Sequence, residues 1–226
     1  MTPTRFVLWD IDGTLLEAKG YGWRLADRAF RQLYGRPLVH MVPLAGRTDR
    51  AIWTDVLDRH GVPGAPDELI TVIESLAPGS HAADAALLPG ADAAIHALTA
   101  HSTVVQSVLT GNLGPVAAAK LGAVGLGAGL DLRLAAYGRD HAVRADLVAV
   151  ARTALARLHP GTSGITTILI GDTPLDVEAA HAAGARAIGV ATGRFSAAEL
   201  TAAGAALLLP DLTDTDRLVA AVLAES

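Results

Sequence analysis

The sequence contains no cysteine, and this absence excludes disulfide bridges, thiol catalysis and thiolate metal sites in the 226-residue chain. Phenylalanine, tryptophan and tyrosine together make up only 4% of the residues, although hydrophobic residues as a whole make up 51%. Much of this content is alanine, and no uninterrupted apolar run reaches the roughly 18 residues that a transmembrane helix needs. We therefore expect a globular protein without a membrane span.

Clusters of basic residues are absent as well, and the formal net charge is −5. This balance argues against nucleic acid as the main partner. No basic segment precedes an apolar stretch and a cleavage site near the start of the sequence, so a secretory signal is not expected. We predict a cytoplasmic protein, long enough for one large domain or two unequal ones. The sequence makes no prediction of the oligomeric state.

An apolar run from Phe6 to Trp9 ends in two carboxylates one residue apart, Asp10 and Asp12. A run without alternation is typical of a strand buried on both faces of a parallel sheet. The carboxylates then lie where open α/β sheets bind ligands, and Gly13 permits the tight turn that follows. Two such anions repel unless a cation lies between them, and oxygen ligands favour a hard ion such as magnesium. The alternative is a turn without a ligand.

A second apolar run, residues 104–109, ends in a pattern typical of anion binding. A hydroxyl, a glycine, an amide and then a proline near the start of a helix follow it, in the order Thr110, Gly111, Asn112 and Pro115. Such an arrangement presents the backbone NH groups and the positive end of the helix dipole to a phosphate. The same residues also suit a plain turn and helix cap.

A third apolar run, residues 168–170, ends in Gly171 and Asp172, and Asp176 follows in the first turn of a helix that starts near Pro174. A strand again ends in a carboxylate at the edge of the predicted sheet. Asp176 either faces the same site or only complements the positive end of the helix dipole.

Between the first and second runs, roughly seventy residues show helical periodicity and no strand pattern, which is too long for a connecting loop. Apolar stripes predict helices from Trp23 to a stop near Gly35, from Asp49 to Gly61, and over residues 69–76. Pro89 and Gly90 mark the return to the main domain. We infer a core domain of residues 1–16 and 89–226 and an inserted helical domain of residues 17–88.

From Ala91 onward, helices and strands alternate as in a doubly wound sheet. The pattern predicts helices over residues 92–98 and 147–158 and from about Asp216, and strands over residues 132–136, 187–190 and 206–209. The fold class predicted from the residues is therefore α/β, with a parallel sheet.

The segment Asp10-Ile11-Asp12-Gly13-Thr14-Leu15 resembles the first signature of the haloacid dehalogenase-like (HAD) hydrolase superfamily, in its phosphatase branch. Thr110 resembles the second signature, and Gly171-Asp172-Thr173-Pro174-Leu175-Asp176 resembles the fourth. The resemblance covers essentially the whole chain and implies a Rossmann-like HAD core with an inserted all-helical cap. The loop Ala45-Gly46-Arg47-Thr48-Asp49 resembles one that faces the substrate in phosphoglycolate-phosphatase-like members, although Thr48 or Asp49 could be only a helix N-cap.

This resemblance implies a magnesium-dependent phosphomonoester hydrolase that acts on a small-molecule phosphate ester. Asp10 would be the nucleophile that forms an aspartyl phosphate, and Asp12 would be the general acid and base. Thr110, Gly111 and Asn112 would bind the transferring phosphate, and Arg47 would contact the rest of the substrate. Mg²⁺ would be held by Asp10, the backbone carbonyl of Asp12 and Asp172, with Asp176 in or near the first shell.

The third signature, usually a lysine, is where the sequence departs from the family pattern. Lys120 lies eight positions beyond Asn112, about 12 Å along a helix, and we expect it to fall short of the phosphate. Arg144 begins a helix after the loop that leads to the usual position, so we predict that Arg144 supplies the charge. Arg139 is the reserve candidate.

Two other functions are compatible with this fold. A phosphomutase would use the same core with a cap that excludes water, and a non-catalytic binding protein would use the scaffold alone. A dehalogenase is disfavoured because that branch lacks an acid at the position of Asp12.

Overall fold

A six-stranded parallel sheet forms the centre of the computed structural model, which describes residues 3–80, 82–162 and 164–224. The strand order is β5-β4-β1-β6-β7-β8, and every neighbouring pair is parallel. The strands are β1 Arg5–Trp9, β4 Val104–Thr110, β5 Ala136–Tyr137, β6 Thr166–Gly171, β7 Arg186–Val190 and β8 Leu207–Leu209. The predicted α/β class with a doubly wound parallel sheet is confirmed.

Helices cover both faces of this sheet. One face is packed by α4, α5 and α9, and the other by α6, α7 and α8. Their bounds are α4 Ala91–Thr99, α5 Gly114–Ala123, α6 Arg144–Leu158, α7 Pro174–Ala182, α8 Ala197–Ala202 and α9 Thr215–Leu223. No described helix is both long and apolar enough to span a membrane.

Strand β1 shows why its sequence is apolar without alternation. Phe6 and Leu8 pack into the cluster beneath α6 to α8, whereas Val7 and Trp9 pack into the cluster beneath α4, α5 and α9. All four side chains are fully buried. The strand pairs with β4 on one side and β6 on the other, so it has no free edge. Every face and edge of β1 is thus covered by the protein.

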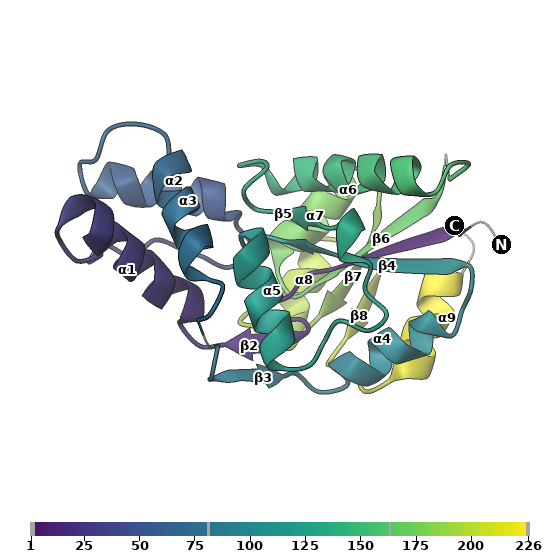
Figure 1. The fold of residues 1–226 in the computed structure, drawn as a ribbon. Helices are drawn as coiled ribbons and strands as arrows, with labels where there is room; N and C mark the ends of the chain where they lie inside the picture. The colour runs from purple at the N-terminus through teal and green to yellow at the C-terminus, as the bar shows by residue number, and fades with distance from the viewer. Residues whose placement is uncertain (1–2, 81, 163, 225–226) are drawn as a thin grey trace.

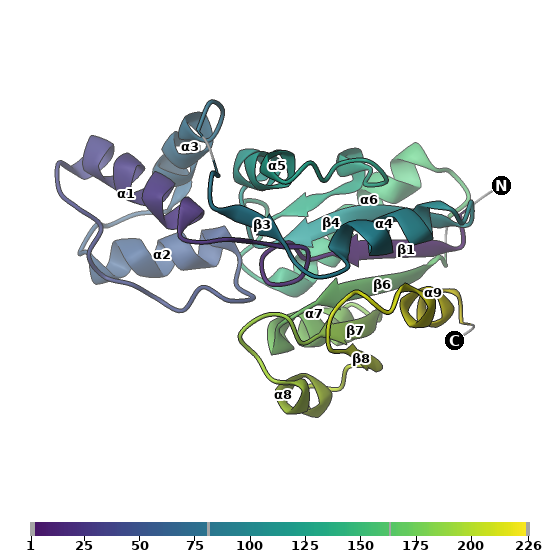
Figure 2. The same cartoon turned by 90° about the horizontal axis from the view of Figure 1, so that it is seen from below.

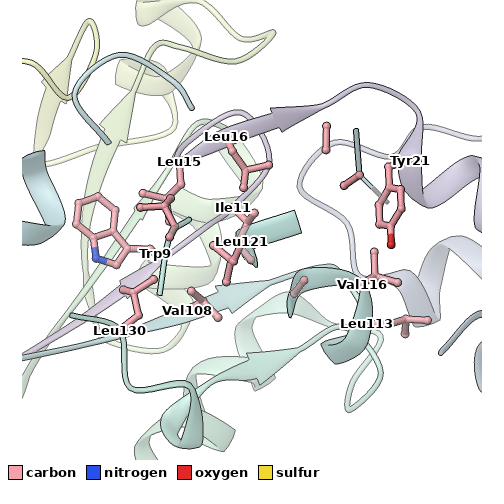
Figure 3. Close-up of a cluster of buried hydrophobic side chains, with 14 of the residues drawn as sticks. Trp9, Ile11, Leu15, Leu16, Tyr21, Val108, Leu113, Val116, Leu121 and Leu130 are labelled. Atoms are coloured by element: carbon pink, nitrogen blue, oxygen red, sulfur yellow. The ribbon is translucent and has the colours of Figure 1, made fainter. Parts of the chain in front are cut away.

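The turn after β1 continues the buried cluster on the face of α4, α5 and α9. Ile11, Leu15 and Leu16 gather with Trp9 against Val108, Leu121 and Leu130, as Figure 3 shows. Two backbone hydrogen bonds of 2.9 Å close the turn: the Leu15 NH donates to the Ile11 carbonyl, and the Gly13 NH donates to the Leu16 carbonyl. Apolar packing on both sides of Asp10 therefore fixes the backbone that carries it.

Three helices, α1 Tyr21–Tyr34, α2 Asp49–Arg59 and α3 Asp67–Leu76, group together beyond the carboxyl ends of the sheet strands (Figures 1 and 2). We call residues 19–84 the cap. Helix α1 lies between Gly20 and Gly35, whose φ angles of 68° and 66° lie in the left-handed region that favours glycine. Helix α2 is capped by Thr48, whose hydroxyl accepts a hydrogen bond from the Ala51 NH, so the capping interpretation of this loop is correct.

A two-stranded antiparallel sheet lies where the chain enters and leaves the cap. It pairs β2 Leu16–Ala18 with β3 Ala85–Leu87. The sequence shows no strand pattern in this segment, because three residues are too few to show alternation. The predicted boundary after residue 16 lies within β2, and the one before residue 89 lies just after β3. Both boundaries stay a prediction, as does an all-helical cap. Residues 1–2, 81, 163 and 225–226 of the predicted domains lie outside the described structure.

One predicted strand is largely wrong. Residues 132–136 contain a short 3-10 helix, η1 Leu132–Leu134, and only Ala136 joins the sheet, in β5. The Asp131 side chain accepts a hydrogen bond from the Arg133 NH and begins this helical turn. A local cap of this kind competes with an extended conformation, and here it outweighs the apolar pattern.

Candidate active site

The three predicted strand ends meet at one place. Asp10 follows β1, Thr110 ends β4 and Asp172 follows β6, and β1 lies between the other two strands. The strand order reverses at β1, because the chain passes from β1 to β4 on one side and later returns to β6 on the other. The carboxyl ends of these strands therefore form a topological switch point, where open α/β sheets bind ligands. A cavity of about 570 Å³ opens here between the core and the cap.

Asp10, Asp172 and Asp176 form a buried carboxylate cluster, of which Asp10 and Asp172 line this cavity. One oxygen from each lies within 4.8 Å of the others. Burial raises the pKa of Asp10 to about 7, although Arg144 opposes the shift. Burial and the neighbouring Asp10 charge raise the pKa of Asp172 to about 8. Three carboxylates this close strongly favour a cation among them.

Arg144, at the start of α6, supplies one positive charge to this cluster. Its guanidinium lies 2.6 Å from Asp10 Oδ1 and 2.7 Å from Asp176 Oδ1, and it also donates to the Leu109 carbonyl. Burial disfavours the charged form, but Asp176 and Asp10 outweigh it and raise the pKa of Arg144 above its ordinary value. The predicted third-signature cation therefore lies beside the predicted nucleophile, and its role in catalysis stays a prediction.

The cluster is suited to a hard metal ion. Asp176 Oδ1 is buried and, within the described residues, accepts no well-aligned hydrogen bond despite its contact with Arg144. Asp172 has only one hydrogen bond to a described side chain, from the Thr14 hydroxyl at 3.2 Å. Oxygen ligands in this number and this proximity are what divalent ions such as Mg²⁺ bind. A buried triad of aspartates that could hold a metal is thus present.

Glycine makes room for the Asp172 carboxylate. A Cβ at Gly13, whose φ is 85°, would lie 2.4 Å from Asp172 Oδ2, and a Cβ at Gly193 would lie within 1.7 Å of the same atom. Thr192, which precedes Gly193, donates its hydroxyl to the Gly13 carbonyl at 2.6 Å. Residues 192–193 follow β7 as a hydroxyl and a glycine, so the signal that marked Thr110 and Gly111 would also have found them.

Asp176 has a second role in its own helix. Its carboxylate accepts hydrogen bonds from the Thr173 NH and hydroxyl, and its NH donates to the Thr173 hydroxyl, which forms a capping box at the start of α7. The structural interpretation of Asp176 is therefore correct, and it coexists with membership of the carboxylate cluster. One oxygen caps the helix, and the other faces Arg144.

Asp12 lies outside the carboxylate cluster and faces α5. Both of its oxygens accept hydrogen bonds from the Lys120 ammonium, at 2.8 and 2.6 Å. The Asn112 amide donates to Asp12 at 2.6 Å and to the Thr110 hydroxyl at 2.7 Å. These contacts bring together four residues of the candidate site and hold the Asp12 carboxylate on the α5 side.

Lys120 reaches the candidate site, although the helical rise argued against it; that it falls short of a bound phosphate stays a prediction. Its side chain is buried, and the ammonium also donates to Asn112 Oδ1 at 2.7 Å. The helical rise gives only the separation of Lys120 from Asn112 along the axis of α5. The side chains of Asp12 and Asn112 extend toward Lys120 and meet its ammonium. Among the described residues, both Lys120 and Arg144 are thus bound to site carboxylates, whereas Arg139 pairs with Glu74 of the cap.

Arg47 lines the cavity, but its guanidinium is held within the cap. It lies 2.6 Å from Asp55 of α2 and donates to the carbonyls of Pro43 and Ala51. Contact between Arg47 and a substrate stays a prediction, which requires the ion pair with Asp55 to open. The loop of residues 45–49 nevertheless lies at the site, because the Gly46 carbonyl accepts a hydrogen bond from the Arg144 guanidinium.

Asp49, the last residue of the loop that resembles a substrate-facing one, lines the cavity. Its carboxylate accepts a hydrogen bond from the Leu113 NH at 3.0 Å, and its own NH donates to the Gly111 carbonyl at 2.7 Å. Burial raises the pKa of Asp49 to about 7. Asp49 therefore joins the first turn of α2 to the phosphate loop predicted after β4.

The comparisons with known proteins agree with this architecture. Residues 147–215 match the model of the HAD-hydrolase-like family. No curated protein matches the sequence. The chain is structurally similar to a predicted phosphatase from Clostridium acetobutylicum, with a TM-score of 0.66 and 18% identity over 98% of this chain and 99% of that chain.

Two further solved structures have the same fold. A predicted phosphoglycolate phosphatase from Haemophilus somnus has a TM-score of 0.66 and 15% identity over 96% of this chain and 98% of that one. A Bacteroides vulgatus protein provisionally described as a β-phosphoglucomutase has a TM-score of 0.65 and 18% identity, covering 99% and 92% of the two chains. The resemblance inferred from the signatures is thus confirmed at the level of the fold, and residues 147–215 match the HAD-hydrolase-like family model.

Proposed function

We propose that this chain is a magnesium-dependent phosphomonoester hydrolase that acts on a small phosphorylated metabolite through an aspartyl-phosphate intermediate. The observation that carries the proposal is the position of Asp10. Its buried carboxylate lies at the end of the central strand, beside Arg144 and two further aspartates, and faces a cavity bordered by Thr110 and Asn112. An anionic nucleophile, a fixed cation and phosphate-binding groups are thus in one place.

In the first half-reaction, an Asp10 carboxylate oxygen attacks phosphorus and the bond between phosphorus and the ester oxygen breaks. Asp12 gives its proton to the departing oxygen, so that the product leaves as an alcohol. Thr110 and the backbone NH groups of Gly111 and Asn112 bind the equatorial oxygens as negative charge develops there.

In the second half-reaction, water attacks phosphorus and the bond between phosphorus and Asp10 breaks. Asp12 takes the proton from this water, inorganic phosphate leaves, and the Asp10 carboxylate is restored. Arg144 offsets the charge of Asp10 throughout, because it lies 2.6 Å away and stays protonated.

Asp10, Asp172 and Asp176, together with the Asp12 backbone carbonyl, would hold the magnesium ion. When bound, the ion neutralises the repulsion between the carboxylates and the phosphate. The ordinary preference of Mg²⁺ for oxygen ligands supports this assignment over zinc, since the site contains no sulfur or imidazole ligand within the described residues.

The test is the release of p-nitrophenol and inorganic phosphate from p-nitrophenyl phosphate, with and without magnesium. A hydrolase releases both products in equal amounts and loses activity when the metal is removed. A non-catalytic binding protein releases neither, whereas a phosphomutase of the same fold moves phosphate between positions of a sugar phosphate faster than it releases phosphate. The last two results would each overturn the proposal.

A further inference from the structure

The cap lines its side of the cavity mostly with apolar and aromatic side chains. We call this surface the cap wall and define it as Tyr21, Trp23, Leu44, Ile52, Trp53 and Ile73. Four of these side chains are less than 5% exposed: Tyr21, Ile52, Trp53 and Ile73. Val116 of α5 continues the surface into the core, and it belongs with Tyr21 to the buried cluster drawn in Figure 3. A phosphate group alone needs much less room than this cavity of about 570 Å³ provides.

The polar atoms of the cap wall are either already bonded or shielded. The Tyr21 hydroxyl is hydrogen-bonded to the Ser80 hydroxyl at 2.5 Å. The Trp53 indole NH is buried and has no hydrogen-bond acceptor among the described residues. The ring is instead held by packing against Trp23, with the ring centroids 6.3 Å apart. Because this surface has no hydrogen-bond acceptor even for the Trp53 indole NH, it has few acceptors for the hydroxyl groups of a sugar.

Most of the positive charge around the cavity is also committed. Three of the cations that line the cavity are bound to protein carboxylates, each at 2.6 Å: Arg47 to Asp55, Lys120 to Asp12 and Arg144 to Asp10. Arg194 also lines the cavity, but it follows Gly193 at the Asp172 end, where the phosphate would lie. A second anionic group on the substrate would therefore find no free cation on the described cap wall.

We propose that the cap wall binds the alcohol part of the phosphate ester, and that this part is an uncharged aromatic or otherwise apolar group. The inference rests on the proposed hydrolase function and deepens it by naming the substrate class. Burial of an apolar group against Trp53, Ile52 and Ile73 is favourable because these side chains are already dry. A short carboxylated ester and a polyhydroxylated ester would both be poor substrates, since each would lose hydration without gaining a partner.

Three alkyl phosphates whose alcohols leave with similar difficulty provide the test: 2-phenylethyl phosphate, glycerol 1-phosphate and 2-phosphoglycolate. With the full chain and magnesium, we expect kcat/KM for 2-phenylethyl phosphate to exceed the other two by about tenfold or more, as burial of a phenyl ring allows. Trp53→Ala should remove most of this preference, because it should lower kcat/KM for 2-phenylethyl phosphate far more than kcat/KM for glycerol 1-phosphate. Tyr34→Ala, which alters a cap aromatic that packs on Phe30 outside the cavity lining, should preserve the preference.

Different results would overturn the apolar subsite and the hydrolase function. Activity toward p-nitrophenyl phosphate, together with a preference for 2-phosphoglycolate or glycerol 1-phosphate, would overturn the apolar subsite and leave the hydrolase intact. No activity toward any ester would overturn the hydrolase.

Binding then tests the subsite without turnover. Two of the three tryptophans, Trp23 and Trp53, belong to the cap wall, whereas Trp9 is buried in the core and bonded to Gln106. Titration with 2-phenylethylphosphonate should therefore give a saturable change in tryptophan fluorescence, with about tenfold weaker binding in Trp53→Ala. The absence of a saturable change, or equal binding of phosphonoacetate, would overturn the inference.

Discussion

Asp10 carries the reactivity of the site, and its neighbours determine its ionisation. Asp10→Asn keeps the shape of the side chain and removes the nucleophilic charge, so phosphate release should fall by about 10³-fold or more. The melting temperature should stay equal or rise, because the amide no longer repels Asp172 and Asp176 within the buried cluster. Both quantities are measured on the same preparation. Asp84→Asn, at an exposed ion pair with Arg24, is the matched control and should leave turnover unchanged. Substantial turnover by a folded Asp10→Asn protein would exclude an aspartyl phosphate.

Lys120 and Arg144 hold different carboxylates, so their removal should have different signatures. Arg144→Ala removes the cation beside Asp10 and should lower kcat/KM by about 10²-fold for every ester. Lys120→Ala releases Asp12, the proposed proton donor, so its effect should grow with the basicity of the leaving alcohol and be smallest for p-nitrophenyl phosphate. The measurement is kcat/KM for each variant across esters of graded leaving-group basicity. Parallel losses for Lys120→Ala across the series would show that it supports only the structure of α5.

The residues that the sequence predicted best are those whose environment is local. Asp10 and Asp172 each directly follow a strand and Thr110 ends one, so an apolar run and a polar stop suffice to place them. The positions of the Lys120 and Arg47 side chains depend instead on how separate elements of the fold pack together. Lys120 meets a carboxylate 108 positions away, and Arg47 turns to Asp55 rather than to the cavity centre. Periodicity carries no information about either contact.

At the scale of elements, two loops of the core and one of the cap fit together only because glycine occurs at the contacts. A Cβ at Gly138 would lie 1.8 Å from the Gly111 carbonyl oxygen, and a Cβ at Gly111 would lie 2.0 Å from the Arg47 carbonyl oxygen. Backbone hydrogen bonds join the same loops, from the Asp49 NH to Gly111 and from the Arg50 NH to Gly138. The cap and the core thus meet backbone to backbone beside the candidate site.

Gly138→Ala should hold these loops apart. We expect KM for p-nitrophenyl phosphate to rise by about tenfold, with a smaller change in kcat, because the cap no longer closes against the core while Asp10 and Arg144 are untouched. Steady-state kinetics measures both constants. Gly122→Ala is the matched control, since a Cβ there meets nothing within 4 Å, and it should behave as the unmodified protein. Normal kinetics in Gly138→Ala would show that the contact is not needed for substrate binding.

The elements themselves were predicted with uneven success for physical reasons. Long, periodic helices such as α1 and α6 and the largely buried strands β1, β4 and β6 agree with the pattern in the sequence. The pair β2 and β3 could not be predicted, because each strand has three residues and is stabilised by a partner about seventy positions away. Residues 132–136 were misassigned because the side-chain bond from Asp131 favours a helical turn. Short elements depend on partners, whereas long elements depend mainly on their own periodicity.

At the scale of the whole molecule, buried carboxylates make the stability of the metal-free protein depend on pH. Burial raises the pKa of Asp10 and Asp49 to about 7 and that of Asp172 to about 8, from 3.8 in the unfolded chain. Between these values the folded state binds protons that the unfolded state has lost, so the free energy of unfolding falls as pH rises from about 4 to 8. The melting temperature without metal should accordingly be higher at pH 5.5 than at pH 8, by roughly 5 °C or more.

Magnesium should reverse this trend, because its ligands must be deprotonated. We expect the rise in melting temperature on adding magnesium to be larger at pH 8 than at pH 5.5, and calcium at the same ionic strength serves as a control for ion type. Asp172→Asn should reduce both the pH dependence and the magnesium effect. A metal-independent melting temperature at pH 8 would contradict the assignment of the carboxylate cluster as a metal site.

The central place of β1 in the sheet also bears on the order in which the protein can assemble during synthesis. Residues 5–9 pair with residues 104–110 and 166–171, both of which are translated later. At about 5–20 residues per second, the second partner follows roughly 10–30 s after β1. For that interval the nascent chain carries an apolar strand with an unpaired edge, which is the kind of segment that aggregates or binds chaperones. The strand that precedes Asp10 is therefore synthesised early and enclosed late.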